Sequence, residues 1–183
     1  MTMIETADDF ATGGLRGGRS LYAYRVRGRE RSAVVLWIGG RGDEPDRVFT
    51  VPRAGRRHVP VFVTVRQARV CLRRRGRQPA TSEVDTLDLG RVQHWLADPE
   101  RRRAPLGAVL EAWNFFEDLA RGLDAADRLP RQGALHNSAY EKLFGAACEG
   151  AAWTPDEQRA VLELIRAGVE LWNSCPALAN PRS

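Results

Sequence analysis

The chain has 183 residues, which is enough for one domain with a substantial core or for two small lobes. Hydrophobic residues make up 43% and charged residues 28% of the sequence, as in an ordinary soluble protein. No apolar run approaches the roughly 18 residues that a membrane span requires, and the first ten residues, MTMIETADDF, lack the apolar segment of a secretory signal. We therefore expect a cytoplasmic protein without a membrane span.

The charge is distributed unevenly along the chain. Residues 14–77 contain 17 arginines and four acidic residues, a net charge of +13, whereas residues 78–183 carry a net charge of −5. Such asymmetry indicates contact with nucleic acid or with a membrane surface, or pairing between the two halves. Lys142 is the only lysine, and this preference for arginine is typical of a GC-rich bacterial genome.

The first part of the chain is predicted to form short strands. Residues 1–19 are acidic and then glycine-rich, which predicts a flexible leader. An alternating pattern at 21–26 and a β-branched run at 32–38 predict two strands that form a hairpin. A third strand is predicted at 47–51, ended by Pro52, and a fourth at 59–63, with a basic loop between them at 53–58.

A basic helix is expected to follow the strands. Thr64 and Gln67 have the spacing of a capping box, in which each side chain satisfies a free backbone donor at a helix start. The helix is predicted to end at Gly76, with Ala68 and Leu72 on its apolar side. Its polar side is almost entirely arginine, and the helix dipole favours cations near its C-terminal end. These arginines are Arg66, Arg69, Arg73 and Arg74, with Arg75 and Arg77 at the end.

The strongest helical pattern of the chain lies at residues 105–123. An apolar stripe that includes Trp113 and Phe116 predicts a face packed against a large partner surface. Glu117 and Asp118 are expected on the solvated side of this helix, without partners. The segment before it is predicted to contain a linker at 78–86 with a short strand at 84–87, a short helix capped by Asp88, and a charged connection at 100–103.

Two further capping boxes predict the last helices. Ser138 and Glu141 are expected to open one helix after a loop at 129–136, and Thr154 and Glu157 another that runs to about Asn173. The last helix has a wide apolar arc, so we expect it to pack against the central helix with its tryptophan inward.

No segment carries a convincing catalytic or metal-binding motif. The run GGLRGGRS at 13–20 resembles a phosphate-binding loop, but a strand follows it where that motif requires a helix. The histidines have no metal-ligand spacing, and the odd number of cysteines indicates reduced thiols. Of the histidines, His136 is the best candidate, because it precedes a predicted helix start. These residues are His58, His94 and His136, and Cys71, Cys148 and Cys175. No metal or cofactor site is predicted.

The candidate binding feature is a set of arginines. Its charge is that of a phosphate-binding or nucleic-acid-binding face, and Tyr22, Tyr24 and Trp37 would supply base stacking if they are exposed. The alternatives are a solvated charged face and pairing with the acidic helical half. The set consists of Arg53, Arg56, Arg57, Arg66, Arg69, Arg73, Arg74, Arg75 and Arg77.

The order of elements, strands first and helices later, predicts the α+β class. We expect a small, mainly antiparallel sheet with one basic helix, followed by a helical C-terminal half. Residues 20–183 are expected to form one domain, with a basic β-rich lobe at 20–77 and a helical lobe at 84–175.

No specific motif assigns the chain to a family, but its arrangement is similar to small bacterial accessory proteins such as toxin-neutralising immunity proteins. A short sheet and an arginine-rich helix lead into a capped helical unit without an active site. This likeness implies a protein partner, so we hypothesise a non-enzymatic binding module of the immunity or antitoxin type. The alternative is a nucleic-acid-binding protein that uses the arginine-rich half, and an enzyme with a site assembled from distant residues stays open. No membrane partner is expected.

Overall fold

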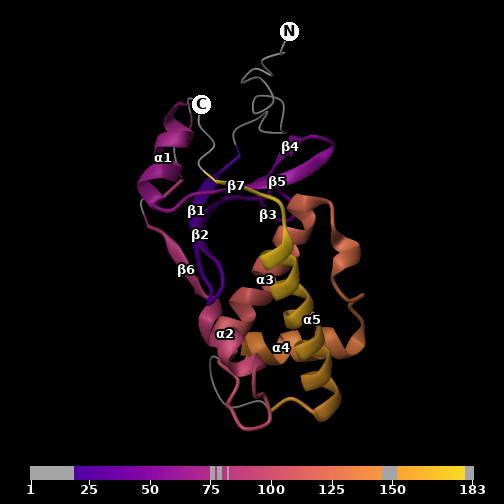
Figure 1. Cartoon of the computed structure of the whole chain (residues 1–183). Helices are drawn as coiled ribbons and strands as arrows, with labels where there is room; N and C mark the ends of the chain where they lie inside the picture. Colours follow the sequence, from indigo (N-terminus) through magenta and orange to yellow (C-terminus); the bar gives the residue numbers. More distant parts are fainter. Residues whose placement is uncertain (1–18, 75–76, 78–79, 82, 146–151, 180–183) are drawn as a thin grey trace.

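The computed structural model describes residues 19–74, 77, 80–81, 83–145 and 152–179 (Figure 1). It has the predicted α+β class, with two small mixed sheets built mostly from the first part of the chain and a helical C-terminal half. Nearly all of the predicted leader, at 1–18, lies outside the described residues.

The first sheet has the strand order β3-β2-β1-β6. The predicted hairpin is present: β1 and β2 pair antiparallel, with Tyr24 opposite Val35. The short strand expected near 84–87 is also present and pairs with β1 in parallel. The strands are β1 (Leu21–Arg27), β2 (Ser32–Ile38), β3 (Arg47–Val48) and β6 (Asp85–Asp88).

The second sheet, β4-β5-β7, corrects three predictions. The strand expected at 47–51 is divided between the two sheets, and Pro52 lies inside β4, where an edge strand tolerates its missing N–H. The basic loop expected at 53–58 is only a two-residue turn, because Ala54 and Gly55 adopt the positive φ angles, 50° and 73°, of a tight hairpin. The strand β7 was not predicted. The strands are β4 (Val51–Arg53), β5 (Arg56–Val61) and β7 (Ala177–Ala179).

The helices follow the predicted order, with two boundaries that differ from the prediction. The capping box at Thr154 is present in full, whereas the helix expected to begin at Ser138 begins at Ala134. Pro105 is the N-cap of the central helix rather than its first residue, and the helix ends at a left-handed Asp124. The helices are α1 (Val65–Arg74), α2 (Leu89–Leu96), α3 (Leu106–Leu123), α4 (Ala134–Gly145) and α5 (Pro155–Ser174), with a short 3-10 turn, η2 (Ala126–Arg128).

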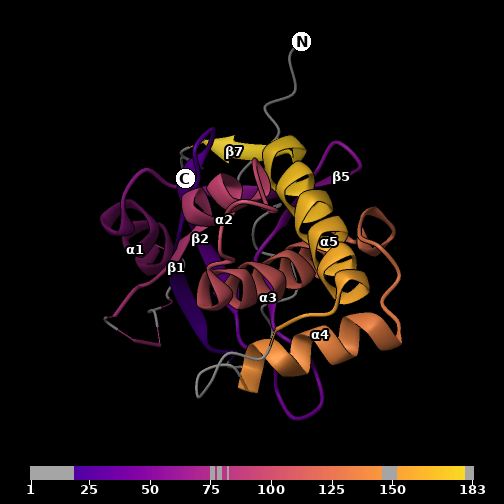
Figure 2. The same cartoon turned by 90° about the horizontal axis from the view of Figure 1, so that it is seen from below.

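The first sheet is covered on both faces. Side chains of successive strand residues point to opposite faces, so Leu21 and Ala23 of β1 pack with α1, whereas Tyr24 and Val26 pack with α2, α3 and α5. Figure 2 shows α1 on one side of the β1–β2 hairpin and α3 on the other. The hairpin is therefore the layer that separates two hydrophobic clusters.

Helices α3 and α5 pack together as predicted, with the tryptophan of α5 inward. The Trp172 ring meets the Phe115 ring edge to face at 5.4 Å between centroids, and Gly168 lies directly against the ring of Phe116. Aromatic side chains of this size bury much apolar area and prefer such tilted contacts. This interface is a central part of the larger cluster.

Candidate functional site

The basic helix α1 carries free arginines on the side turned away from the sheet. Its predicted capping box is present: the Gln67 N–H donates to Thr64 Oγ1, and Gln67 Oε1 accepts from the Thr64 N–H, both at 3.2 Å. Arg66, Arg73 and Arg74 are exposed. None of these three side chains forms an ion pair or a hydrogen bond with another residue in the described part of the chain.

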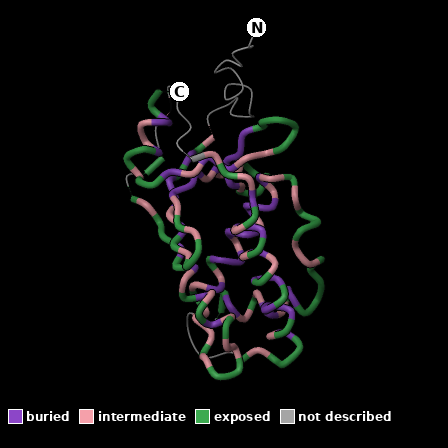
Figure 3. The backbone as a smooth tube through the Cα atoms, in the orientation of Figure 1, coloured by how far each residue is buried: buried purple, intermediate pink, exposed green. Residues whose placement is uncertain are grey.

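The other predicted arginines are divided among several places. Arg69 and Arg77 are half-buried and take part in interactions, and Arg75 lies outside the described residues. Arg53 and Arg56 are opposite each other beside the tip of the β4–β5 hairpin, a tip that Figure 3 shows as exposed. In Figure 1 this hairpin and α1 lie at the same end of the molecule but on opposite sides of it.

Arg57 has a structural position at the end of α3. Its Nε donates to the Gly122 carbonyl at 2.8 Å and to Thr50 Oγ1 at 3.0 Å, and it lies 3.3 Å from the Asp124 carboxylate. Thr50 Oγ1 also donates to the Gly122 carbonyl. A cation at a helix C-terminus is favoured by the helix dipole. Arg57 therefore stabilises the end of α3, and its side chain is not available to bind a partner.

The aromatic residues proposed for base stacking are mostly covered. Tyr24 is only 8% exposed, and its ring lies between Trp37, at 4.6 Å, and Phe115, at 6.0 Å between centroids. Burial raises the pKa of Tyr24 above its usual range, with the nearby carboxylate of Glu111 acting in the same direction. Of the three proposed residues, only Tyr22 is exposed, at 37%, so the sheet offers no stacking platform at Tyr24.

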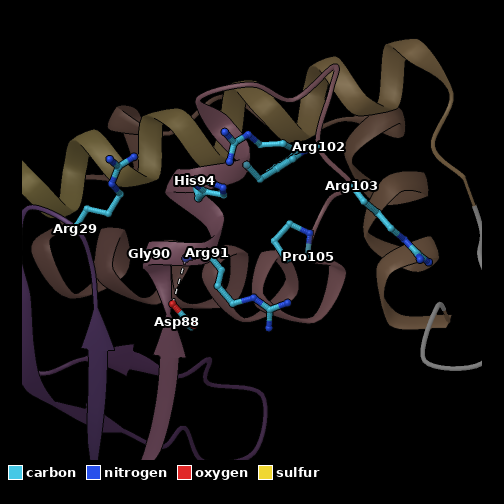
Figure 4. Close-up of a pocket in the computed structure, with 9 residues that line it drawn as sticks. Arg29, Asp88, Gly90, Arg91, His94, Arg102, Arg103 and Pro105 are labelled. Atoms are coloured by element: carbon cyan, nitrogen blue, oxygen red, sulfur yellow. Dashed lines mark hydrogen bonds between the residues drawn. The ribbon is translucent and has the colours of Figure 1, made fainter.

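An open pocket of about 600 Å³ lies where the β1–β2 turn, the start of α2 and the connection from α2 to α3 meet (Figure 4). Four arginines from these three segments line it, together with one histidine and one aspartate. The lining residues are Arg29, Asp88, Gly90, Arg91, His94, Trp95, Arg102, Arg103 and Pro105.

Hydrogen bonds fix two of the segments that form the pocket. The Arg29 N–H donates to Gln93 Oε1 at 2.7 Å, which joins the β1–β2 turn to α2. The predicted helix cap is present, since Asp88 Oδ1 accepts from the Arg91 N–H at 3.1 Å. Trp95 is buried beneath the pocket and packs against Trp153 at 6.1 Å between ring centroids. The pocket is therefore formed by segments that are anchored to one another.

The pocket is strongly cationic. Its four guanidinium groups and one carboxylate give a net charge of +3 with His94 neutral. Arg29, Arg91 and Arg103 are exposed and Arg102 is half-buried. Among the described residues, none of these four side chains has an ion-pair or hydrogen-bond partner. Guanidinium groups in this state are available to bind carboxylate or phosphate groups in bidentate geometry.

Asp118 of α3 is buried, which corrects the prediction of a solvated carboxylate without a partner. Burial raises its pKa to about 7; the paired Arg121 opposes this shift, and the Asp46 carboxylate adds to it. Arg121 also pairs with Glu117 at 3.0 Å, and Glu117 accepts a hydrogen bond from Trp113 Nε1 at 2.9 Å. Both carboxylates thus hold α3 and its neighbours in place.

Glu157 is a second buried carboxylate with structural partners. Ser138 Oγ donates to it at 2.6 Å, Lys142 Nζ pairs with it at 2.7 Å, and the Thr154 N–H donates to it at 2.7 Å. These hydrogen bonds, that from Lys142 first, lower the pKa of Glu157 to about 2. Ser138, which was expected to cap its own helix, therefore joins α4 to α5 instead.

The histidines and cysteines do not gather into a site. His136 is buried within α4, not in a loop, and its ring packs against Trp113. Burial raises the pKa of the Cys175 thiol, although Arg31 Nη1, 3.3 Å from its sulfur, opposes this shift. Cys71 is buried and takes part in an interaction, and Cys148 lies outside the described residues. In the part of the chain that the structure describes, no three His, Cys, Asp or Glu side chains are grouped to hold a metal ion.

The sequence contained only a partial signal for the pocket. The sequence predicts a charged connection that contains the three arginines at 101–103, and it places His94 on a short helix. The approach of Arg29 depends on the parallel pairing of β6 with β1, which brings the start of α2 beside the β1–β2 turn. A contact of that kind between distant segments leaves no local pattern.

In the described segments, none of the helices combines the length and the apolar character needed to cross a membrane.

Comparisons with known proteins assign no family to the chain. Neither protein-family models, nor curated proteins, nor solved structures gave a match to this chain.

Proposed function

We propose that the protein is a non-enzymatic binding module whose partner-binding surface is the exposed arginine face of α1. The observation that carries this proposal is the free state of Arg66, Arg73 and Arg74, which have no ion-pair partner among the described residues. The other side of the same helix is buried on the sheet through Ala68 and Leu72. A rigid helix that presents unpaired cations is suited to bind an acidic surface.

The partner that we propose is a protein with an acidic surface. Val63, two residues before α1, is 80% exposed, and its N–H donates to Gln67 Oε1 at 3.0 Å, which holds it beside the helix start. Protein interfaces combine exposed apolar residues with arginine, and Val63 beside the arginines of α1 offers both. The likeness to immunity proteins implies a toxin as the partner. A bacterial cytoplasm is the proposed setting, and the free, buried thiol of Cys175 supports it.

Site-specific photo-crosslinking tests this proposal. The full chain carries a benzophenone amino acid at Val63 and is mixed with an extract of the cells that produce it. We expect a defined protein adduct that disappears in the triple variant Arg66→Glu, Arg73→Glu and Arg74→Glu. The matched control replaces three exposed arginines elsewhere by glutamate, and so changes the net charge by the same amount as the α1 variant. These arginines are Arg101, Arg131 and Arg166. An adduct that survives the α1 variant, or the lack of any adduct, contradicts the proposal.

Nucleic acid is the second candidate partner, and one observation favours it. Arg53 and Arg56 add exposed cations at the same end of the molecule as α1 (Figure 1). Binding of this kind weakens steeply with salt, because phosphate contacts release counterions. Fluorescence anisotropy with labelled single- and double-stranded RNA and DNA, at low and near-physiological salt, tests it. Affinity that falls steeply with salt and is reduced by the α1 variant supports this function, and no binding at low salt excludes it.

A further inference from the structure

We propose that the arginine pocket beside α2 binds a small molecule with two adjacent phosphate groups, such as a nucleoside diphosphate. The pocket is distinct from the α1 face, because it is formed by the β1–β2 turn, the start of α2 and the α2–α3 connection. Figure 1 shows α2 and α1 at opposite ends of the sheet. The proposal therefore stands independently of the partner proposed for α1.

Unpaired positive charge is the first argument. Arg29, Arg91, Arg102 and Arg103 line one pocket, and none has an ion-pair partner within the described residues. Cations gathered in this way repel one another, and an anion that enters the pocket relieves the repulsion. The planar guanidinium fork binds phosphate oxygens in pairs, so the pocket has the chemistry of a phosphate site.

The size of the pocket and the distribution of its cations indicate a ligand with more than one anionic group. The volume, about 600 Å³, lies within the range of small-molecule sites. Figure 4 shows Arg29 on the left beside the β1–β2 turn, Arg102 near His94, Arg91 extending below, and Arg103 extending away to the right. Because Figure 4 shows these guanidinium groups spread around the pocket and not converging on one point, two adjacent phosphate groups reach more of them than one phosphate group does.

The remaining lining residues are consistent with a nucleotide-sized ligand. The Asp88 carboxylate accepts the Arg91 N–H at 3.1 Å, and its charge disfavours a phosphate group next to it, which directs the phosphates toward Arg29 and Arg102. Pro105 and Trp95 supply an apolar wall. A ligand with phosphates at one end and a less polar body at the other satisfies both parts of this lining.

The positions of the key arginines are held before any ligand binds. The Arg29 N–H donates to Gln93 Oε1 at 2.7 Å, and the Arg102 N–H donates to the Asp98 carbonyl at 3.2 Å. The Asp98 N–H in turn donates to the Trp95 carbonyl at 3.0 Å. Because these backbone segments are anchored, binding has to order only the arginine side chains, which lowers its entropic cost.

Isothermal titration calorimetry of the full chain at low salt tests the proposal with four probes: ADP, pyrophosphate, orthophosphate and a single-stranded DNA oligonucleotide. The pocket variants are Arg29→Gln and Arg102→Gln. The matched control is Arg101→Gln, because Arg101 is exposed and adjacent to Arg102 but does not line the pocket. The triple α1 variant separates this site from the proposed partner surface.

We expect ADP and pyrophosphate to bind, and each pocket variant to weaken both by at least about tenfold, the effect of losing a charge-assisted hydrogen bond. Arg101→Gln and the α1 variant should leave both affinities within about twofold of those of the native protein, because neither change removes a hydrogen bond in the pocket. Orthophosphate should bind at least about tenfold more weakly than pyrophosphate, because it engages fewer guanidinium groups. Three results would overturn the proposal: no binding of ADP or pyrophosphate, equal affinity for orthophosphate, or DNA binding alone that is lost only in the α1 variant.

Discussion

Asp118 is a carboxylate on the polar side of α3 that the fold nevertheless buries. The covering comes from the segment around β3, since Arg121 donates both to Asp118 and to the Asp46 carbonyl. The pairing with Arg121 does not fully offset the loss of hydration, and the pKa of Asp118 is raised to about 7. A buried carboxylate of this kind makes folding stability depend on pH.

The replacement Asp118→Asn should remove that pH dependence. Between pH 4 and 7 the folded chain holds a proton that the unfolded chain releases, so the native protein gains stability as the pH falls through about 7. Relative to the native protein, the variant should therefore gain on the order of 1–3 kcal/mol when the pH rises from 5 to 8. Urea unfolding at both pH values measures this difference. The control Asp156→Asn changes an exposed aspartate on α5 and should follow the native pH dependence; equal curves for Asp118→Asn and the native protein would refute the assignment.

At the scale of elements, the contact between α3 and α5 depends on the absence of a side chain. A Cβ at Gly168 would lie 2.1 Å from the Phe116 ring, a distance that requires the ring to move. Phe116 is fully buried and packs against Phe115 at 5.7 Å between centroids, so the ring can move only by displacing the side chains around it. Glycine is thus required here for close approach of the two helices.

The replacement Gly168→Ala should destabilise the protein. Overpacking of a core typically lowers the free energy of unfolding by about 1–3 kcal/mol. The higher helix propensity of alanine offsets up to about 1 kcal/mol of this loss. Chemical denaturation followed by circular dichroism measures the net loss. Gly107→Ala, in the first turn of α3 where nothing lies within 4 Å of the added Cβ, is the matched control and should be neutral or slightly stabilising. A stabilised Gly168→Ala protein would show that the two helices can separate without cost.

At the scale of the whole molecule, the β1–β2 hairpin belongs to both hydrophobic clusters. Val35 contributes to the cluster with α2, α3, α4 and α5, and Val34 and Leu36 to the cluster with α1. Because one hairpin supplies a wall to each, neither cluster keeps its packing when the hairpin unfolds. We therefore propose that the chain from residue 20 onward unfolds as one cooperative unit.

Two probes on opposite faces of the sheet test this cooperativity. Tryptophan fluorescence reports on the cluster with α3 and α5, which holds Trp113 and Trp172. Thiol reactivity of Cys71 reports on the cluster with α1, in a variant in which Cys148 and Cys175 are replaced by serine. The urea midpoints from the two probes should coincide, as two-state unfolding requires. A lower midpoint for Cys71 would show that α1 and its cluster unfold separately.

Much of the fold could be predicted because its signals are local. The β1–β2 hairpin, the capping boxes at Thr64 and Thr154, and the apolar stripe of α3 each follow from residues close in sequence. Two of the errors share one cause, which is that a distant partner changes the outcome. Ser138 has the spacing of a cap, but its hydroxyl donates to Glu157. Pro52 would end a central strand, but β4 lies at an edge.

For the candidate sites, too, local sequence patterns determine one part and contacts between distant segments determine the other. The sequence alone determined that arginines concentrate along α1, because helical periodicity places Arg66, Arg73 and Arg74 opposite an apolar face. Only the tertiary structure decided which arginines are free. It engages Arg57 at the end of α3 and brings Arg29 beside Arg102 in one pocket. The physical reason is that periodicity fixes the side of an element on which a charge lies, whereas pairing and burial depend on which other elements pack against that side.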